Sequence, residues 1–327
     1  VHSALSMDAY MWDVRGTPDD VYRFAKGDAI GLAPYGEDGK PGRTAQLERP
    51  LDFAAVTDHA EFLGQINICT EDPWKLGYWW PHCVMTRANH LWTQLLAANW
   101  WAHLGVIGRD KEHSFACSLS DCQEGEADFW SNIQQAAEDH YDRSAECTFT
   151  TFVGYEYTDA PDHNNLHRNV IFRNASVTER AISTYDTGSY NFPELWVQLR
   201  AQCIDAGTDC DALAIPHNSN LSGGLMFRDP RSEREALDRL FFEPVIELIQ
   251  HKASSECRFD RLAGRGVGTE DELCDFEQAK DDNLAMLGTV DGEIRTERAR
   301  PVPVDEFARR NMARNVLKDG LALGQKT

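Results

Sequence analysis

Imidazole and carboxylate side chains stand at the ends of four apolar runs that are predicted to form β-strands. Asp58 and His59 close the first run, Glu156 follows the second, His167 stands just before the third, and His217 follows the fourth. A single His in such a place is more often a core or capping residue. Only 11 of the 327 residues are His, however, so their recurrence at strand ends favours a shared function.

The chemistry that suits these residues is metal binding. The ends of parallel strands converge on one face of a sheet or barrel, so that residues far apart in the sequence meet there. Imidazole and carboxylate groups are the ligands of Zn, Mn and Fe, and a bridging Glu can hold two such ions together. We therefore predict a metal centre at these strand ends.

Other His, Asp and Glu residues are assigned by their position. His2 opens the chain, and a fifth apolar run carries Glu247 and ends at His251. Five more histidines fall in a long segment between the first two strands and are assigned to structure or surface: His82, His90, His103, His113 and His140.

Several alternative chemistries lack their motifs. There is no G-x-S-x-G elbow of a serine hydrolase, no phosphate-binding or dinucleotide fingerprint, and no C-x-x-C pair for a zinc knuckle. A cysteine nucleophile stays open, although none of the nine cysteines has a His partner in its sequence context.

Five apolar runs are predicted to be strands that position these residues: Leu51–Thr57, Thr148–Tyr155, Arg168–Phe172, Asp211–Ile215 and Pro244–Gln250. Helical patterns separate them, and they include Val304–Leu317 near the end of the chain. Because most of the runs are continuously apolar, we expect a mainly parallel sheet covered on both faces, in an α/β fold.

The segment 61–147 is far longer than an ordinary crossover and contains most of the nine Trp residues. An insertion on the carboxyl side of a parallel sheet is where lids and substrate walls are built. A helical subdomain with its own aromatic core explains the pattern equally well.

Composition limits the partners. A net charge of −21 repels a phosphate backbone, so we expect no nucleic-acid partner, although this charge could serve only solubility. No apolar run approaches the roughly 20 residues of a membrane span, so we expect no membrane partner. The oligomeric state is not predicted.

The nine cysteines favour an oxidising compartment. Three pairs lie across short loop-like segments and are predicted disulfides: Cys117/Cys122, Cys203/Cys210 and Cys257/Cys274. One cysteine must remain unpaired within the chain. Reduced, buried thiols are the alternative, which keeps a cytoplasmic location open.

Five motifs follow one another along the chain: Val1-His2-Ser3-Ala4-Leu5-Ser6-Met7-Asp8, Val56-Thr57-Asp58-His59, Gly154-Tyr155-Glu156, His167 and Pro216-His217-Asn218. In this order they resemble the motifs of the PHP (polymerase and histidinol phosphatase) superfamily, over essentially the whole chain. Residues 52–64 are especially similar to a branch filed as a domain of unknown function, which is common in exported bacterial proteins. A periplasmic or secreted location agrees with the cysteine usage.

This resemblance implies a fold and a site. The fold would be a distorted, TIM-like (β/α)7 barrel forming one domain over residues 1–327, with 61–147 as a helical insertion. The site would hold two or three divalent ions of Zn, Mn or Fe, with Glu156 bridging them. The implied ligands are His2, Asp8, His59, Glu156, His167 and His217.

The resemblance also implies supporting roles. Asp58 and Glu247 are expected to orient ligands, and His251 to contact the substrate. Two parts of the family pattern are absent: the first His of H-x-H would fall just before Val1, and a closing Asp-x-His would follow Thr327. We therefore expect the domain to be incomplete at both ends.

The expected activity is hydrolysis of a phosphoester in a small-molecule substrate by a metal-bound hydroxide. Arg168 and Lys252 are expected to add positive charge at the site. Two alternatives stay open. The same residues could hydrolyse a sulfate ester, an amide or a lactone, or the domain could be catalytically silent and bind only a metal or another ligand.

Overall fold

The structure of the chain is a computed structural model. It describes residues 1–36, 39–88, 90–107, 112–161, 164–260, 264–269, 273–275, 289–290, 293–295, 301–302 and 304–324.

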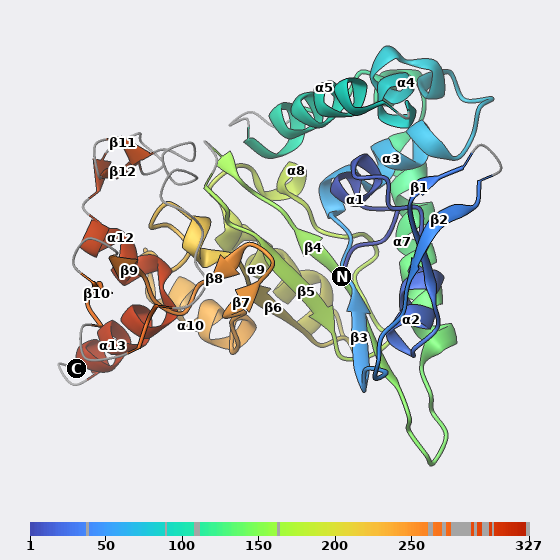
Figure 1. The fold of residues 1–327 in the computed structure, drawn as a ribbon. Helices are drawn as coiled ribbons and strands as arrows, with labels where there is room; N and C mark the ends of the chain where they lie inside the picture. Colours follow the sequence, from blue (N-terminus) through green and yellow to red (C-terminus); the bar gives the residue numbers. More distant parts are fainter. Residues whose placement is uncertain are drawn as a thin grey trace.

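A four-stranded sheet crosses the middle of the molecule (Figure 1). Its strands are β3 (Phe53–Val56), β4 (Thr150–Tyr157), β5 (Arg168–Phe172) and β6 (Ala212–Pro216), in that spatial order. β3 and β4 are parallel, whereas β5 runs antiparallel to both of its neighbours. Four of the five predicted strands are therefore present, each with bounds within two residues of the prediction.

The predicted (β/α)7 barrel with a mainly parallel sheet is wrong. Over the described residues the sheets are this open four-stranded sheet and four small ones of two or three strands, and no barrel closes. The direction of β5 follows from its connection, because only residues 158–167 separate it from β4. A parallel crossover needs a dozen or more residues, usually including a helix.

The fifth predicted strand, Pro244–Gln250, is also largely wrong. Only its last two residues are extended, as β7 (Ile249–Gln250), which forms a short hairpin with β8 (Ala253–Ser254). An apolar run of six or seven residues does not by itself establish a sheet strand, and in this run Val245 and Leu248 are exposed. Here the run does not pair with β6 as a ladder; the Glu247 N–H donates to the Pro216 carbonyl at 3.1 Å.

One face of the sheet is better covered than the other. Along β5 and β6, fully buried residues such as Val170 and Ala214 alternate with half-buried ones such as Ile171 and Leu213. The covered face packs on helices, among them α7 (Cys122–His140), α9 (Phe192–Leu199) and α10 (Glu233–Phe242). The sequence predicted cover on both faces, but the second face is only half-buried along β5 and β6, and this alternation is typical of a sheet with antiparallel pairs.

The N-terminal segment lies against the edge strand β3. Backbone bonds join Val1 to Ala55 and Thr57, so the first residues follow this strand. The segment then forms α1 (Met7–Met11), α2 (Pro18–Ala25) and a hairpin of β1 (Ile30–Tyr35) with β2 (Pro41–Ala45).

The segment 61–147 contains helices joined by turns and loops in its described part. After the short turn η1 (Ala60–Phe62) it contains α3 (Leu63–Thr70), η2 (Leu76–Trp79), α4 (Pro81–Arg87), α5 (Leu91–Trp101), η3 (Ala102–Ile107), α6 (Ala116–Leu119) and α7. Its aromatic residues share the main core, since the Trp130 ring lies 5.7 Å from Tyr155 of β4. Gly64 lets α3 approach α7, because a Cβ there would come within 2.1 Å of the Cys122 carbonyl oxygen. The segment is therefore part of one core rather than a separate one.

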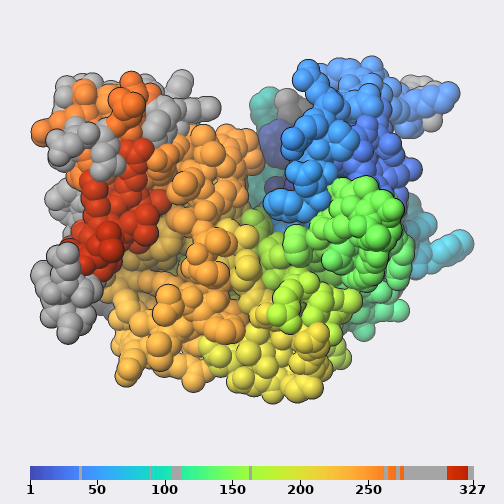
Figure 2. Space-filling view, turned by 90° about the horizontal axis from the view of Figure 1, so that it is seen from below, coloured from blue at the N-terminus to red at the C-terminus, as the bar shows by residue number. Residues whose placement is uncertain are grey.

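Short elements complete the C-terminal part: α8 (Thr184–Thr187), η5 (Arg200–Ile204), η6 (Ser219–Leu221), β9 (Phe259–Asp260), β10 (Arg265–Gly266), β11 (Thr289–Val290), β12 (Glu293–Arg295), β13 (Pro301–Val302), α12 (Val304–Asn311) and α13 (Ala313–Gly324). The single helix predicted over 304–317 is thus two helices. Asn311 ties them to the loop after β6, because its side-chain oxygen accepts from Ser222 Oγ at 2.5 Å and from Gly224 N at 3.0 Å. Figure 2 shows the N-terminal and C-terminal segments on opposite sides of the molecule.

Four disulfides link Cys69–Cys83, Cys117–Cys122, Cys203–Cys210 and Cys257–Cys274. Three of them confirm the predicted pairs, and Cys69–Cys83 was not predicted. Cys147 is exposed and free, as one cysteine had to be. Such pairing is typical of proteins in an oxidising compartment. None of the described helices combines the length and the apolar character that crossing a bilayer requires.

Candidate metal centre

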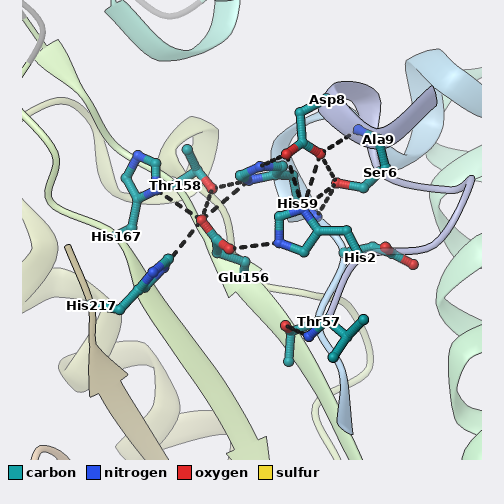
Figure 3. Close-up of polar contacts among 12 residues, drawn as sticks. His2, Ser6, Asp8, Ala9, Thr57, His59, Glu156, Thr158, His167 and His217 are labelled. Carbon is teal, nitrogen blue, oxygen red and sulfur yellow. Dashed lines mark hydrogen bonds and ion pairs between the residues drawn. The ribbon is translucent and has the colours of Figure 1, made fainter. Parts of the chain in front are cut away.

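The predicted ligands meet at one edge of the central sheet (Figure 3). His59 and His217 follow the ends of β3 and β6, and Glu156 lies near the end of β4. His167 precedes β5, and because β5 runs antiparallel, its start lies at the same edge as the ends of its neighbours. His167 therefore lies beside the other predicted ligands because β5 is antiparallel. The sequence predicted this proximity from a parallel sheet, which the structure does not have.

Glu156 stands at the centre of this cluster and is only 2% exposed. Its Oε2 lies 2.8 Å from Nε2 of His2, and its Oε1 lies 2.8 Å from Nδ1 of His167 and 3.3 Å from Nε2 of His217. Each carboxylate oxygen thus faces a different set of imidazoles. Two groups of ligand atoms have the spacing that a metal ion requires: His2, His59 and Glu156, and Glu156, His167 and His217.

The first group is held by Asp8 and Ser6. His2 Nδ1 lies 3.0 Å from Asp8 Oδ1, and Nε2 of His59 lies 3.5 Å from Asp8 Oδ2. Ser6 Oγ donates to Asp8 Oδ1 at 2.7 Å and accepts from the His59 N–H at 3.2 Å. Asp8 therefore lies at the rim of the cluster, with its side chain 43% exposed, and it belongs to neither of the two groups of ligand atoms.

Electrostatics in the first group favour charged forms. Burial alone would lower the pKa of His2, but Asp8 and Glu156 outweigh it and raise that pKa to about 10. Burial would raise the pKa of Glu156, yet His59 and His217 hold it well below its usual range. The carboxylates therefore stay ionised, as binding of a cation requires, whereas the His2 imidazole is protonated at neutral pH and would have to lose that proton to bind a metal.

The second group is more deeply buried. Burial lowers the pKa of His167 to about 3, so its imidazole is neutral and can donate a lone pair. Nδ1 of His217 is contacted by two amide groups, Asn218 Nδ2 at 3.0 Å and Gln250 Nε2 at 3.1 Å. Asn218 adopts a left-handed conformation (φ 52°), which turns its side chain back toward His217.

Three supporting residues were not predicted: Ser6, Thr158 and Gln250. The Thr158 hydroxyl contacts Nδ1 of His59 and donates to Glu156 Oε1 at 3.3 Å. Thr158 follows Glu156 by two positions, so the period of a β-strand could have indicated that both point to the same face. Gln250 is the last residue of β7, and His251 follows it in the turn to β8.

The three residues predicted to support the site lie at different places. Asp58 is fully buried and accepts from the Ser3 N–H and hydroxyl, both at 2.6 Å, so it fixes the backbone next to His2. Glu247 lies beside the end of β6, and its Oε1 is buried without a hydrogen-bond partner in the described part of the chain. His251 is exposed, and its neighbour Gln250 makes the contact to His217.

Arg168 does not add charge to the cluster. Its guanidinium donates to Glu243 at 2.7 Å and to the Leu166 carbonyl at 2.7 Å, and it stacks 3.8 Å from the centre of the Phe192 ring. This buried pair anchors the backbone around His167 instead. Lys252 is near enough to oppose protonation of His167.

The comparisons with known proteins add one relationship. No curated protein and no solved structure matches the chain. A family profile described as "Protein of unknown function (DUF3604)" matches residues 1–327, the whole chain. The cluster of His, Asp and Glu residues thus lies within the matched region, and the chain belongs to the DUF3604 family.

Proposed function

We propose that the chain is a metal-dependent hydrolase that cleaves phosphoester bonds in a small-molecule substrate with two divalent ions. The observation that carries the proposal is the position of Glu156, whose two oxygens face different sets of imidazoles in a buried cluster. The resemblance of the ordered motifs to the PHP superfamily supports the same proposal. Paired ions a few ångströms apart are widely used for phosphoester hydrolysis.

The residues present fit such ions. Nε2 of His167 is buried and has no hydrogen-bond partner among the described residues, and Nε2 of His217 approaches only Glu156. A buried polar atom without a partner costs roughly 1–3 kcal/mol, and coordination would remove that cost. Imidazole with carboxylate favours Zn, Mn or Fe over Mg or Ca. One ion would be held by His2, His59 and Glu156, with Asp8 beside it, and the other by Glu156, His167 and His217.

The chain's own residues would orient the imidazoles. The Thr158 hydroxyl engages Nδ1 of His59, which leaves Nε2 directed toward Asp8. The side-chain oxygens of Asn218 and Gln250 are buried without partners among the residues described, while their nitrogens face Nδ1 of His217. A half-turn of either amide would let its oxygen accept from Nδ1–H and free the Nε2 lone pair.

Bound divalent ions would supply positive charge to an anionic ester and lower the pKa of water at the site. This answers the objection that a chain with a net charge of −21 would repel a phosphate substrate. We also propose that the protein acts in the periplasm or outside the cell, a location that its four disulfides favour.

A substrate screen tests this proposal. The purified protein is loaded with Mn²⁺ or Zn²⁺ and offered phosphate monoesters, phosphate diesters, sulfate esters, amides and lactones. We expect metal-dependent cleavage of phosphate esters that falls to background in Glu156→Gln and persists in Glu146→Gln, where the replaced carboxylate is exposed in the loop before β4.

The same screen separates the alternatives. Cleavage of only a sulfate ester, amide or lactone would overturn the phosphoesterase assignment while retaining the metal site. Metal uptake without cleavage of any substrate would favour a catalytically silent binding domain.

A further inference from the structure

A cavity of about 320 Å³ lies between α3, the start of α7 and α8. It is lined by both polar and aromatic side chains, among them Glu61, Gln65, His113, Glu126, Arg180 and Tyr185. We propose that this cavity binds a small organic cation, an amine or a guanidine. The proposal does not rest on the function proposed for the metal centre.

The charges of the lining favour a cation. The lining contains three carboxylates, those of Glu61, Glu126 and Asp186, and one guanidinium, that of Arg180. Arg180 donates to Asp186 Oδ1 at 3.0 Å, and its Nε lies 3.3 Å from Glu126 Oε1. This leaves Glu61 as the carboxylate that Arg180 does not neutralise.

Glu61 is 98% buried, with 2% of its surface exposed, and only one of its oxygens is satisfied. Oε1 accepts from the Thr158 N–H at 2.8 Å and the Thr184 N–H at 3.4 Å. Oε2 is buried, and no group in the described part of the chain bonds to it. A buried carboxylate oxygen without a donor is costly, so a ligand that brings an N–H and a positive charge would be stabilised there.

The wall of the cavity suits the apolar part and the charge of such a ligand. The His113 and Tyr185 rings stack with their centres 3.9 Å apart, and the Gln65 amide donates to the Tyr185 hydroxyl at 3.2 Å. Aromatic faces attract organic cations. A bare metal ion is disfavoured, because the described carboxylates of this cavity do not form a group with metal-ligand spacing.

The test is calorimetric titration of the full chain with agmatine, which carries an amine and a guanidinium, before and after metal removal with a chelator. We expect one saturable site per chain in both states. Glu61→Gln should weaken binding about 10-fold or more, as loss of a hydrogen bond to a charged group does. Glu126→Gln should weaken it less, and Glu146→Gln should leave it unchanged.

The matched neutral probe is 1,5-pentanediol, which we expect not to bind. The proposal is overturned if this diol binds as tightly as agmatine, or if agmatine affinity is the same in wild type, Glu61→Gln and Glu126→Gln. Circular dichroism checks the fold of each variant, and if Glu61→Gln does not fold, Glu126→Gln decides. Because the titration is repeated without metal, its failure is distinguishable from failure of the metal centre.

Discussion

Buried histidines lie in two regions of the molecule, one around a carboxylate and the other among aromatic rings. At the sheet edge, His59, His167 and His217 surround the carboxylate of Glu156. In the helical segment, His82 is equally buried, but it stacks on Trp100 with ring centres 4.8 Å apart and packs against Trp101.

The difference shows what distinguishes a ligand from a core histidine. Burial lowers the pKa of both His82, to about 4, and His167, to about 3. Near His82 the polar contact is the Ser114 hydroxyl at 3.2 Å, whereas His167 lies 2.8 Å from a carboxylate that other imidazoles share. Burial alone therefore does not distinguish the two kinds of histidine; the carboxylate that several imidazoles share does, and it makes the sheet-edge cluster the candidate metal site.

Replacing the shared carboxylate of Glu156 should cause the largest loss of metal affinity. Glu156→Gln keeps the shape of the side chain but removes the charge common to both groups, so metal affinity should fall at both. The loss of affinity should exceed the roughly 100-fold loss that follows replacement of a residue that only orients a metal ligand. Competition titration with a metal-binding dye measures it, and His82→Phe is the control that should bind metal normally. Wild-type affinity in Glu156→Gln would refute the shared-carboxylate account.

Removal of one imidazole should affect one ion only. The two ligand groups share Glu156 and no other residue, so His217→Ala should lose the ion of the second group and keep the first. His2→Ala should do the reverse. Metal content per chain, measured after gel filtration, should fall by half in each variant. Complete loss of metal in both variants would show that the two groups do not act as separate sites.

We expect the helical segment to lose stability in acid, because the buried His82 must then take up a proton. Its pKa is about 4 in the folded chain against 6.5 unfolded, so the unfolded state binds a proton first. Its contribution is full above pH 6.5 and decreases as the pH falls toward 4, by up to about 3 kcal/mol. Urea unfolding of metal-free protein at pH 7.5 and 4.5 should show a smaller difference in His82→Phe than in wild type. Equal differences would mean that His82 does not titrate in this way.

We expect the smallest loss of metal affinity when Gln250 is replaced. Gln250 contacts His217 but does not belong to either group of ligand atoms. Gln250→Ala should weaken metal binding about 10-fold, the lower range for such partners. His251→Ala, in the turn that directly follows this short strand, should have no effect because His251 is exposed. The dye competition assay compares them. A larger loss of metal affinity in His251→Ala than in Gln250→Ala would contradict the assignment of Gln250 as the residue that supports His217.

The sequence predicted the site better than the fold. Among the candidate ligands, His217 directly follows β6 and His59 comes three residues after β3, so a local pattern was enough to locate them. The direction of β5 and the absence of a strand over 244–248 depend on pairing between distant segments, which a local pattern does not encode. Gln250 was missed because an amide carries no metal-ligand signature, and only its position beside His217 reveals its role.

The metal content of the purified wild-type chain tests the central claim most directly. The chain is incubated with Mn²⁺ or Zn²⁺, freed of excess ion by gel filtration and analysed by mass spectrometry of the elements. Since two groups of ligand atoms share Glu156, we predict two ions per chain. A chain that retains no metal under these conditions would contradict the account.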